Sequence, residues 1–108
     1  MTEVFHLAAP EDWEKASEEA YRASSLDSEG FIHCSYAHQV AVVANRFYKD
    51  VPSLLVLTID PGRLTSPLRE EPAEGTLFPH IHGPINRDAV IACAPLTRDG
   101  LGQWVFHS

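Results

Sequence analysis

The sequence has little positive charge and few cysteines. Its 108 residues include eight Lys and Arg against fifteen Asp and Glu, so the formal net charge is −7. Nucleic-acid-binding proteins usually present a basic face, because phosphate neutralisation supplies much of their affinity. The eight cations here are scattered singly, so we expect no nucleic-acid partner. The two cysteines, Cys34 and Cys93, lack CxxC spacing, which predicts reduced, buried thiols in a cytoplasmic protein.

Long hydrophobic runs and the common nucleotide and hydrolase motifs are also missing. No stretch approaches about 18 consecutive apolar residues and the acidic start is unlike a signal peptide, so we expect no membrane association. The sequence contains neither a Walker motif nor a dinucleotide-fold glycine motif. Because a GxSxG elbow is absent, it does not predict a Ser-His-Asp hydrolase. The hydrophobic content of 44% and the length predict one folded domain over residues 1–108.

Hydrophobic patterning predicts two helices and six strands. One helix begins at Pro10 and extends to about residue 21, and a second, capped by Ser35, covers residues 36–48. The polar stretches 22–29 and 63–75 predict loops. Apolar runs predict strands at residues 4–7, 31–34, 54–59, 77–82, 89–94 and 104–106.

The order and composition of these elements predict an α+β fold with a mostly antiparallel sheet, because both helices fall in the N-terminal half. The continuous apolar run at 54–59 predicts a strand buried on both faces, and the run at 89–94 predicts another buried strand. Pro79 predicts an edge or a bulge for the strand at 77–82, since proline cannot donate a ladder hydrogen bond.

Four of the six histidines fall at strand positions, which predicts a shared polar cleft. His6 and His33 lie between apolar neighbours, and His80 and His82 are two residues apart, on one face of a strand. These imidazoles would supply directional hydrogen bonds to a small organic ligand. The alternative is a zinc site made of His80, His82 and either His6 or His33. We expect no tightly bound metal, because the third ligand is undefined.

The segment from Glu29 to Gln39 is the most informative stretch. The strand that ends in His33-Cys34-Ser35 runs directly into a helix, which places an imidazole, a hydroxyl and helix N-terminal amides together. Such a group suits a ribose or a phosphate. In the alternative, Ser35 only caps the helix and His33 packs in the core.

The sequence resembles a known bacterial family. The resemblance is over almost the whole chain and rests on Phe5-His6-Leu7, Gly30-Phe31-Ile32-His33-Cys34-Ser35, Gln39 and Phe78-Pro79-His80 with Gly83-Pro84. The family is called domain of unknown function 952. This resemblance implies an ADP-ribosyltransferase-like fold, a split, mostly antiparallel sheet around a cleft that holds NAD in the enzymes of that superfamily. It also implies a distant similarity to the RNA 2′-phosphotransferases.

The resemblance implies two sets of site residues. In the catalytic set, His6 and His33 orient a ribose and Glu71 stabilises positive charge, together with His80. In the ligand-binding set, Ser35 holds phosphate, and the other members are Gln39, Arg46 and His82. The sequence departs from the family pattern at His82, where an aromatic is usual, and at Glu70, where a Trp is usual.

These observations predict a small cytoplasmic protein with a His-lined cleft that binds a nucleotide such as NAD or ADP-ribose. If the protein is an enzyme, the resemblance implies transfer or hydrolysis at a nucleotide ribose, with NAD as a substrate and no resident cofactor. The alternatives are a non-catalytic module that binds a small ligand and a His-ligated metalloprotein. The sequence does not decide the oligomeric state.

Overall fold

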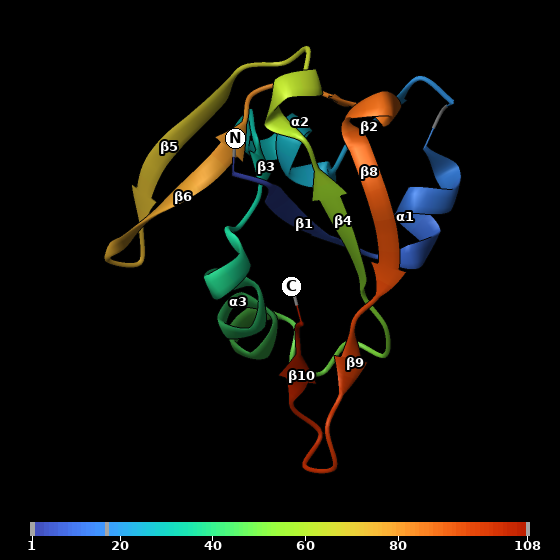
Figure 1. The fold of residues 1–108 in the computed structure, drawn as a ribbon, viewed down its shortest axis with the longest axis vertical. Coiled ribbons are helices and arrows are strands. Elements are labelled where there is room, and N and C mark those ends of the chain that lie inside the picture. Colours follow the sequence, from blue (N-terminus) through green and yellow to red (C-terminus); the bar gives the residue numbers. More distant parts are fainter. Residues whose placement is uncertain (1, 17, 108) are drawn as a thin grey trace.

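The residues that the structure describes form short strands and three α-helices, and all of these helices end before residue 48 (Figure 1). The computed structural model describes residues 2–16 and 18–107. The helices are α1 (Pro10–Lys15), α2 (Ser24–Glu29) and α3 (Val40–Phe47), with short 3-10 turns η1 (Ala37–Gln39), η2 (Pro61–Arg63) and η3 (Arg87–Ala89). The strands are β1 (Val4–Ala8), β2 (Ala20–Tyr21), β3 (Ile32–His33), β4 (Leu55–Ile59), β5 (Leu68–Ala73), β6 (Thr76–Ile81), β7 (Ile85–Asn86), β8 (Val90–Pro95), β9 (Thr97–Arg98) and β10 (Trp104–Val105).

The first sheet has the strand order β1-β4-β8, so β4 is its central strand. The side chains of Leu57 and Ile59 belong to a cluster that includes Tyr21 and Ile32. Val56 points to the other face, into a cluster that includes residues of α3. The prediction of a strand buried on both faces is therefore confirmed for β4.

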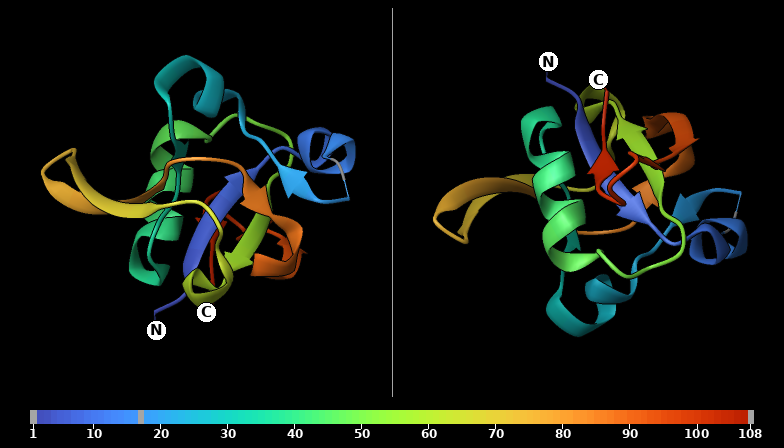
Figure 2. Two further views of the ribbon diagram at one scale, coloured as in Figure 1. Left: turned by 90° about the horizontal axis from the view of Figure 1, so that it is seen from above. Right: turned by 90° about the horizontal axis from the view of Figure 1, so that it is seen from below.

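The second sheet has the order β3-β6-β5 and is joined to the first by a single bridge. Phe5 and Ser35 exchange two backbone hydrogen bonds, with N···O distances of 2.7 and 2.8 Å. The β5–β6 hairpin extends away from the rest of the molecule, and α3 lies beside β1 (Figure 2). In this arrangement α3 lies over one face of the second sheet.

Pro79 lies in the central strand of the second sheet, so the prediction that its strand is an edge or a bulge is wrong. Its carbonyl accepts a hydrogen bond from the Cys34 N–H at 3.2 Å, just beyond the end of β3. In a strand, the N and the carbonyl of one residue point to the same side. The nitrogen of Pro79, which has no N–H, therefore points toward the end of β3, where the hydrogen bonds between β3 and β6 stop.

Two of the helix predictions need correction. α1 ends at Lys15, because Ala20 and Tyr21 pair with β7 instead of continuing the helix. Position 17, between them, lies outside the described residues. The stretch predicted as a loop at 22–29 contains α2, which ends at Gly30 with φ of 88°. A left-handed residue after the last turn is a common helix end and favours glycine.

Two predictions about strands also need correction. The polar stretch 63–75 contains β5, an edge strand whose exposed positions accept charged side chains. β8 has the predicted place but is mostly exposed, because it pairs only with β4. Cys93 is accordingly exposed, whereas Cys34 is buried.

The second predicted helix begins later than expected, because the 3-10 turn η1 precedes α3. Tyr36, not Ser35, is the N-cap of η1.

The predicted fold class is confirmed at the level of a mixed α+β fold with mostly antiparallel sheets. All strand pairs of the described residues are antiparallel. The described part of the chain has three α-helices instead of the predicted two, all in the N-terminal half. No helix among the described residues is long and apolar enough to cross a membrane.

Candidate functional site

Three of the predicted histidines meet on one face of the β3-β6-β5 sheet. His33 lies directly opposite His80 in the β3–β6 register, and His82 follows His80 on the same face. The ring of Phe31 stacks on that of His80, with centroids 4.2 Å apart and planes 19° apart. The Phe31 ring also contacts His33 at 4.8 Å and His82 at 5.5 Å. Phe31 was not among the predicted site residues, although it immediately precedes β3.

Glu71, on β5, joins two of these histidines. Its Oε1 accepts a hydrogen bond from His80 Nδ1 at 2.9 Å and from His82 Nε2 at 2.7 Å. These hydrogen bonds, that from His82 first, lower the pKa of the Glu71 carboxyl. Because a carboxylate only accepts, Nδ1 of His80 must hold a proton, and in the neutral ring Nε2 is then an acceptor. The predicted residues Glu71, His80 and His82 therefore form one connected group.

The His33 ring is at the outer side of this group. Its side chain is 52% exposed, and Nε2 lies 3.0 Å from Glu29 Oε2. His80, in contrast, is only 5% exposed. A sheltered imidazole with a fixed tautomer is the more suitable contact for a ligand, because it does not have to be desolvated or oriented on binding.

A cavity of about 350 Å³ lies between this face of the sheet and α3. Ser35 lines it together with His80 and is 5% exposed. Within residues 2–16 and 18–107, the Ser35 hydroxyl forms no hydrogen bond and is not completely shielded from solvent. The full lining is Leu7, His33, Cys34, Ser35, Val43, Phe47, Tyr48, Ala73, Glu74, Phe78 and His80. The predicted residues His33, Ser35 and His80 thus share one cavity.

His6 lies on the other face of β1 and does not line this cavity. Its Nδ1–H donates to the His33 carbonyl at 2.6 Å, and its Nε2 accepts from the Tyr21 hydroxyl at 3.1 Å. Burial lowers the pKa of His6 to about 4 and raises that of Tyr21. His6 is thus a neutral, fully engaged side chain that joins β1, β2 and β3. Its ribose-orienting role remains a prediction without support from its surroundings.

Gln39 and Arg46 are engaged with the protein. Gln39 is buried, its Oε1 accepts from the Tyr36 N–H, and its Nε2 donates to the Leu77 carbonyl, both at 2.9 Å. Arg46, on α3, forms an ion pair with Glu74 at 2.8 Å. Both residues connect the η1–α3 segment to the β5–β6 hairpin and so position the two walls of the cavity.

The described part of the chain contains no group of three or more His, Cys, Asp or Glu side chains arranged to hold a metal ion. Nδ1 of His80 and Nε2 of His82 are both hydrogen-bonded to one oxygen of Glu71, so these nitrogens point to a carboxylate and not to a shared metal position. Tight metal binding or its absence remains a prediction.

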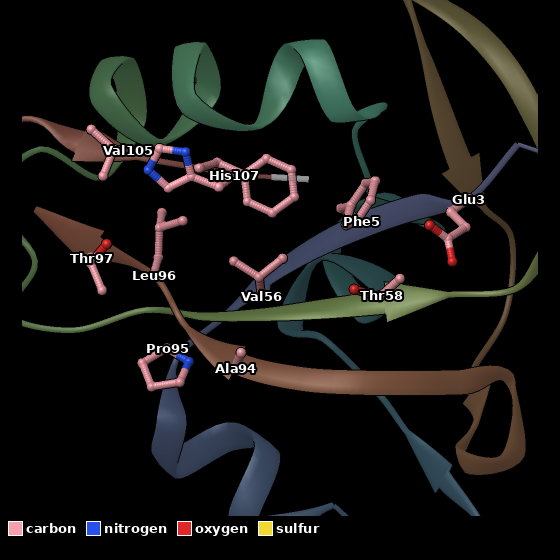
Figure 3. A pocket seen from close by; sticks show the side chains of 11 residues that line it. Glu3, Phe5, Val56, Thr58, Ala94, Pro95, Leu96, Thr97, Val105 and His107 are labelled. Atoms are coloured by element: carbon pink, nitrogen blue, oxygen red, sulfur yellow. The ribbon is translucent and has the colours of Figure 1, made fainter.

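A second cavity, of about 320 Å³, lies over β1 and β4 near the C-terminal segment (Figure 3). This cavity was not predicted from the sequence. Most of its lining is apolar and includes Phe5 and Phe106, whose rings meet edge to face at 5.0 Å. Glu3 and His107 provide its ionisable groups. No hydrogen-bonded pair of catalytic type is present among its described lining residues.

The family follows from a match to a family model. The model described as "Protein of unknown function (DUF952)" matches residues 7–93. The chain belongs to this family. No curated protein matches the sequence of this DUF952 chain.

The chain is also similar to solved structures of another protein. A crystal structure of protein CC0527 from Caulobacter crescentus has 23% sequence identity and a TM-score of 0.85, and the match covers 96% of this chain and 94% of that chain. A solution NMR structure of CC0527 has 25% identity and a TM-score of 0.79, over 95% of this chain and 91% of that one. These likenesses show the fold, and the names of the structures state no activity or ligand.

Proposed function

We propose that the protein binds a compact, hydroxyl-bearing molecule in the cavity between α3 and the β5–β6 hairpin. A nucleoside, or the nucleoside part of a nucleotide, is a molecule of this kind. The observation that supports this proposal is the hydrogen bonding of the His80 ring. Its Nδ1–H donates to Glu71, so Nε2 of the neutral ring is an acceptor, and both His80 and Ser35 line the cavity.

The size and walls of the cavity favour a small ligand with a flat or apolar part. Pockets for small organic ligands usually measure about 300–1,000 Å³. The cavity here, at about 350 Å³, is at the lower end of that range, so it fits one ring system and a sugar better than a whole dinucleotide. Val43, Phe47 and Phe78 provide apolar surface against which a ring can pack.

The charges around the cavity do not favour a phosphate contact. Its described lining includes Glu74 and no Lys or Arg, and the nearby Arg46 is paired with that Glu74. The net charge of −7 adds no attraction for an anion. Of the ligands implied by the family resemblance, NAD and ADP-ribose would therefore bind through a nucleoside part, with the phosphates outside the cavity. This replaces the phosphate-binding role expected for Ser35.

We propose binding without cleavage of NAD. Transfer or hydrolysis at the ribose requires an anionic group beside the sugar where positive charge develops. Glu71 lies behind His80 and does not line the cavity, and Glu74, the carboxylate that does, is paired with Arg46. Chromatographic detection of nicotinamide released from NAD tests this point, and turnover above the buffer rate contradicts it.

We also propose that the protein acts in the cytoplasm. Its two cysteines, Cys34 and Cys93, are free thiols, and proteins of oxidising compartments usually pair theirs. The partner is a small molecule.

Calorimetry with adenosine, AMP, ADP-ribose and NAD tests the proposed binding. Adenosine and AMP are expected to bind with similar dissociation constants, on the order of 100 µM, or about 5–6 kcal/mol. Raising the salt concentration should change neither constant by more than about twofold. Replacing His80 with Gln should weaken adenosine binding about tenfold, whereas the same change at the exposed His38 should not.

Two results would contradict the proposal. If none of the four compounds binds at millimolar concentration, the nucleoside class is wrong. If AMP binds more than tenfold more tightly than adenosine and salt removes the difference, the phosphate is recognised and the charge argument fails.

A further inference from the structure

Ser35 and His80 are diagonal neighbours in the β3-β6-β5 sheet. The hydrogen bond from the Cys34 N–H to the Pro79 carbonyl continues the register of the His33–His80 pair by one residue. Ser35 therefore comes opposite Phe78, on the same face as His80. Diagonal neighbours in antiparallel strands are about 7–8 Å apart at Cα, which is within reach of a long side chain.

Glu71 occupies the corresponding position on the other side of β6. It pairs with Phe78 in the β5–β6 register and reaches diagonally to His80 Nδ1. His80 thus lies between a carboxylate on β5 and a hydroxyl that follows β3. Its two ring nitrogens point to roughly opposite sides of the ring, so Nε2 faces away from Glu71. Ser35 and His80 line the same cavity, and among the described residues no hydrogen bond joins them before a substrate binds.

We propose that Ser35, His80 and Glu71 are the nucleophile, the general base and the positioning residue of a site that hydrolyses small neutral esters. This inference rests on the proposed function, since the substrate is an acyl ester of the hydroxylated ligand and occupies the same cavity. A hydroxyl, an imidazole and a carboxylate in this order activate serine on several unrelated folds. The absence of a GxSxG elbow excludes the α/β-hydrolase fold, but it does not exclude activation of a serine by histidine on another fold.

The reaction needs no co-reactant besides water. His80 Nε2 takes the proton of the Ser35 hydroxyl while Oγ forms a bond to the ester carbonyl carbon. The bond from that carbon to the alcohol oxygen then breaks, and the alcohol leaves with the proton returned by His80. Water attacks the acyl carbon and gives a proton to His80. The bond to Oγ breaks, Oγ takes back that proton, and a carboxylic acid is released.

The cavity lining indicates the substrate class. Leu7, Val43, Phe47 and Phe78 give an apolar surface for a short acyl chain, and Glu74 disfavours an anionic substrate. Because His80 and Ser35 are each 5% exposed, a bound ester also keeps bulk water away from the proton transfer. We therefore expect a preference for uncharged esters with short acyl groups.

Covalent labelling of the full chain tests the nucleophile. The probe is a neutral alkyl fluorophosphonate, followed by intact mass measurement and peptide mapping. We expect one adduct, on Ser35, and no adduct in Ser35→Ala. Ser53, an exposed serine outside the cavity, supplies the matched control, and Ser53→Ala should be labelled like the wild type. An unlabelled wild type, or a Ser35→Ala variant that is still labelled, overturns the inference.

Hydrolysis of p-nitrophenyl butyrate tests the positioning residue. Glu71→Gln should lower kcat at least tenfold with KM unchanged, and Glu71→Asp should restore part of the rate. Equal kcat values for the wild type and Glu71→Gln overturn the assignment of Glu71. Adenosine binding, measured on the same samples, separates the two proposals. Binding without labelling refutes the hydrolytic site alone, and the absence of both refutes the proposed function as well.

Discussion

Lowering the pH from 7 to 5 should destabilise the protein through His6. This ring is 6% exposed, and both of its nitrogens are hydrogen-bonded in a way that requires the neutral form. Burial lowers the pKa of His6 from the ordinary value of 6.5 to about 4. Between these two values the unfolded chain binds a proton that the folded protein does not, so the free energy of unfolding falls as the pH falls.

The size of this effect follows from the two pKa values of His6. The gap between 6.5 and about 4 corresponds to about 3 kcal/mol in total. Roughly 2 kcal/mol of it is lost between pH 7 and pH 5, where the unfolded chain becomes protonated. The folded protein favours the charged form of Glu71, whereas it favours the neutral form of His6. Its pKa is lowered from 4.5, so the stability that its ionised form contributes is lost only as the pH falls below that value.

Urea unfolding at pH 7, 6 and 5 measures the effect. The loss between pH 7 and pH 5 should be about 2 kcal/mol larger in the wild type than in His6→Gln, which cannot titrate there. His38→Gln, a change at an exposed histidine, should keep the wild-type dependence. If the wild type and His6→Gln lose the same free energy over this range, the buried neutral state of His6 is refuted.

Three further substitutions test the surroundings of the site. Tyr21→Phe removes the donor to His6 Nε2 and should lower the free energy of unfolding by about 1–3 kcal/mol at pH 7, measured in urea, because a buried acceptor is left without a partner. Gln39→Leu removes the hydrogen bond from the Tyr36 N–H within the η1 turn and the hydrogen bond to the Leu77 carbonyl of β6, and should cost about 2 kcal/mol in the same assay; an unchanged midpoint would contradict its structural role. Glu74→Gln frees Arg46 and should tighten AMP binding roughly fivefold relative to adenosine in calorimetry, whereas an unchanged ratio would show that the ion pair does not limit phosphate binding.

Much of the first sheet could be predicted from the sequence, because its core strand is a continuous apolar run. β4 has that pattern, and α3 has a helical apolar stripe that ends before Pro52. β5 could not be predicted, because an edge strand exposed on its outer side gains nothing from apolar residues and its polar sequence is typical of a loop. β8 shows the reverse case, since its apolar residues lie on an exposed edge and not in the core.

The candidate site could be predicted as a set of residues but not as an arrangement. His33, Ser35 and His80 were singled out by their place at strand ends, and the structure brings them to one cavity. The face on which a side chain lies depends on the register, which a single sequence does not define. Side chains alternate along a strand, so His6 and Leu7 lie on opposite faces of β1, but the sequence alone does not show that the Leu7 face is the one that reaches the cavity.

Chemical-shift mapping of adenosine on the isotope-labelled protein tests most directly whether the cavity between α3 and the β5–β6 hairpin is the binding site. The account predicts that amide shifts change around His33 to Ser35, along the end of α3 and in β6 from Phe78 to His80. His80→Gln should remove these changes. Shifts confined to the second cavity, around Glu3, Leu96 and His107, or no shifts at millimolar adenosine, would contradict it.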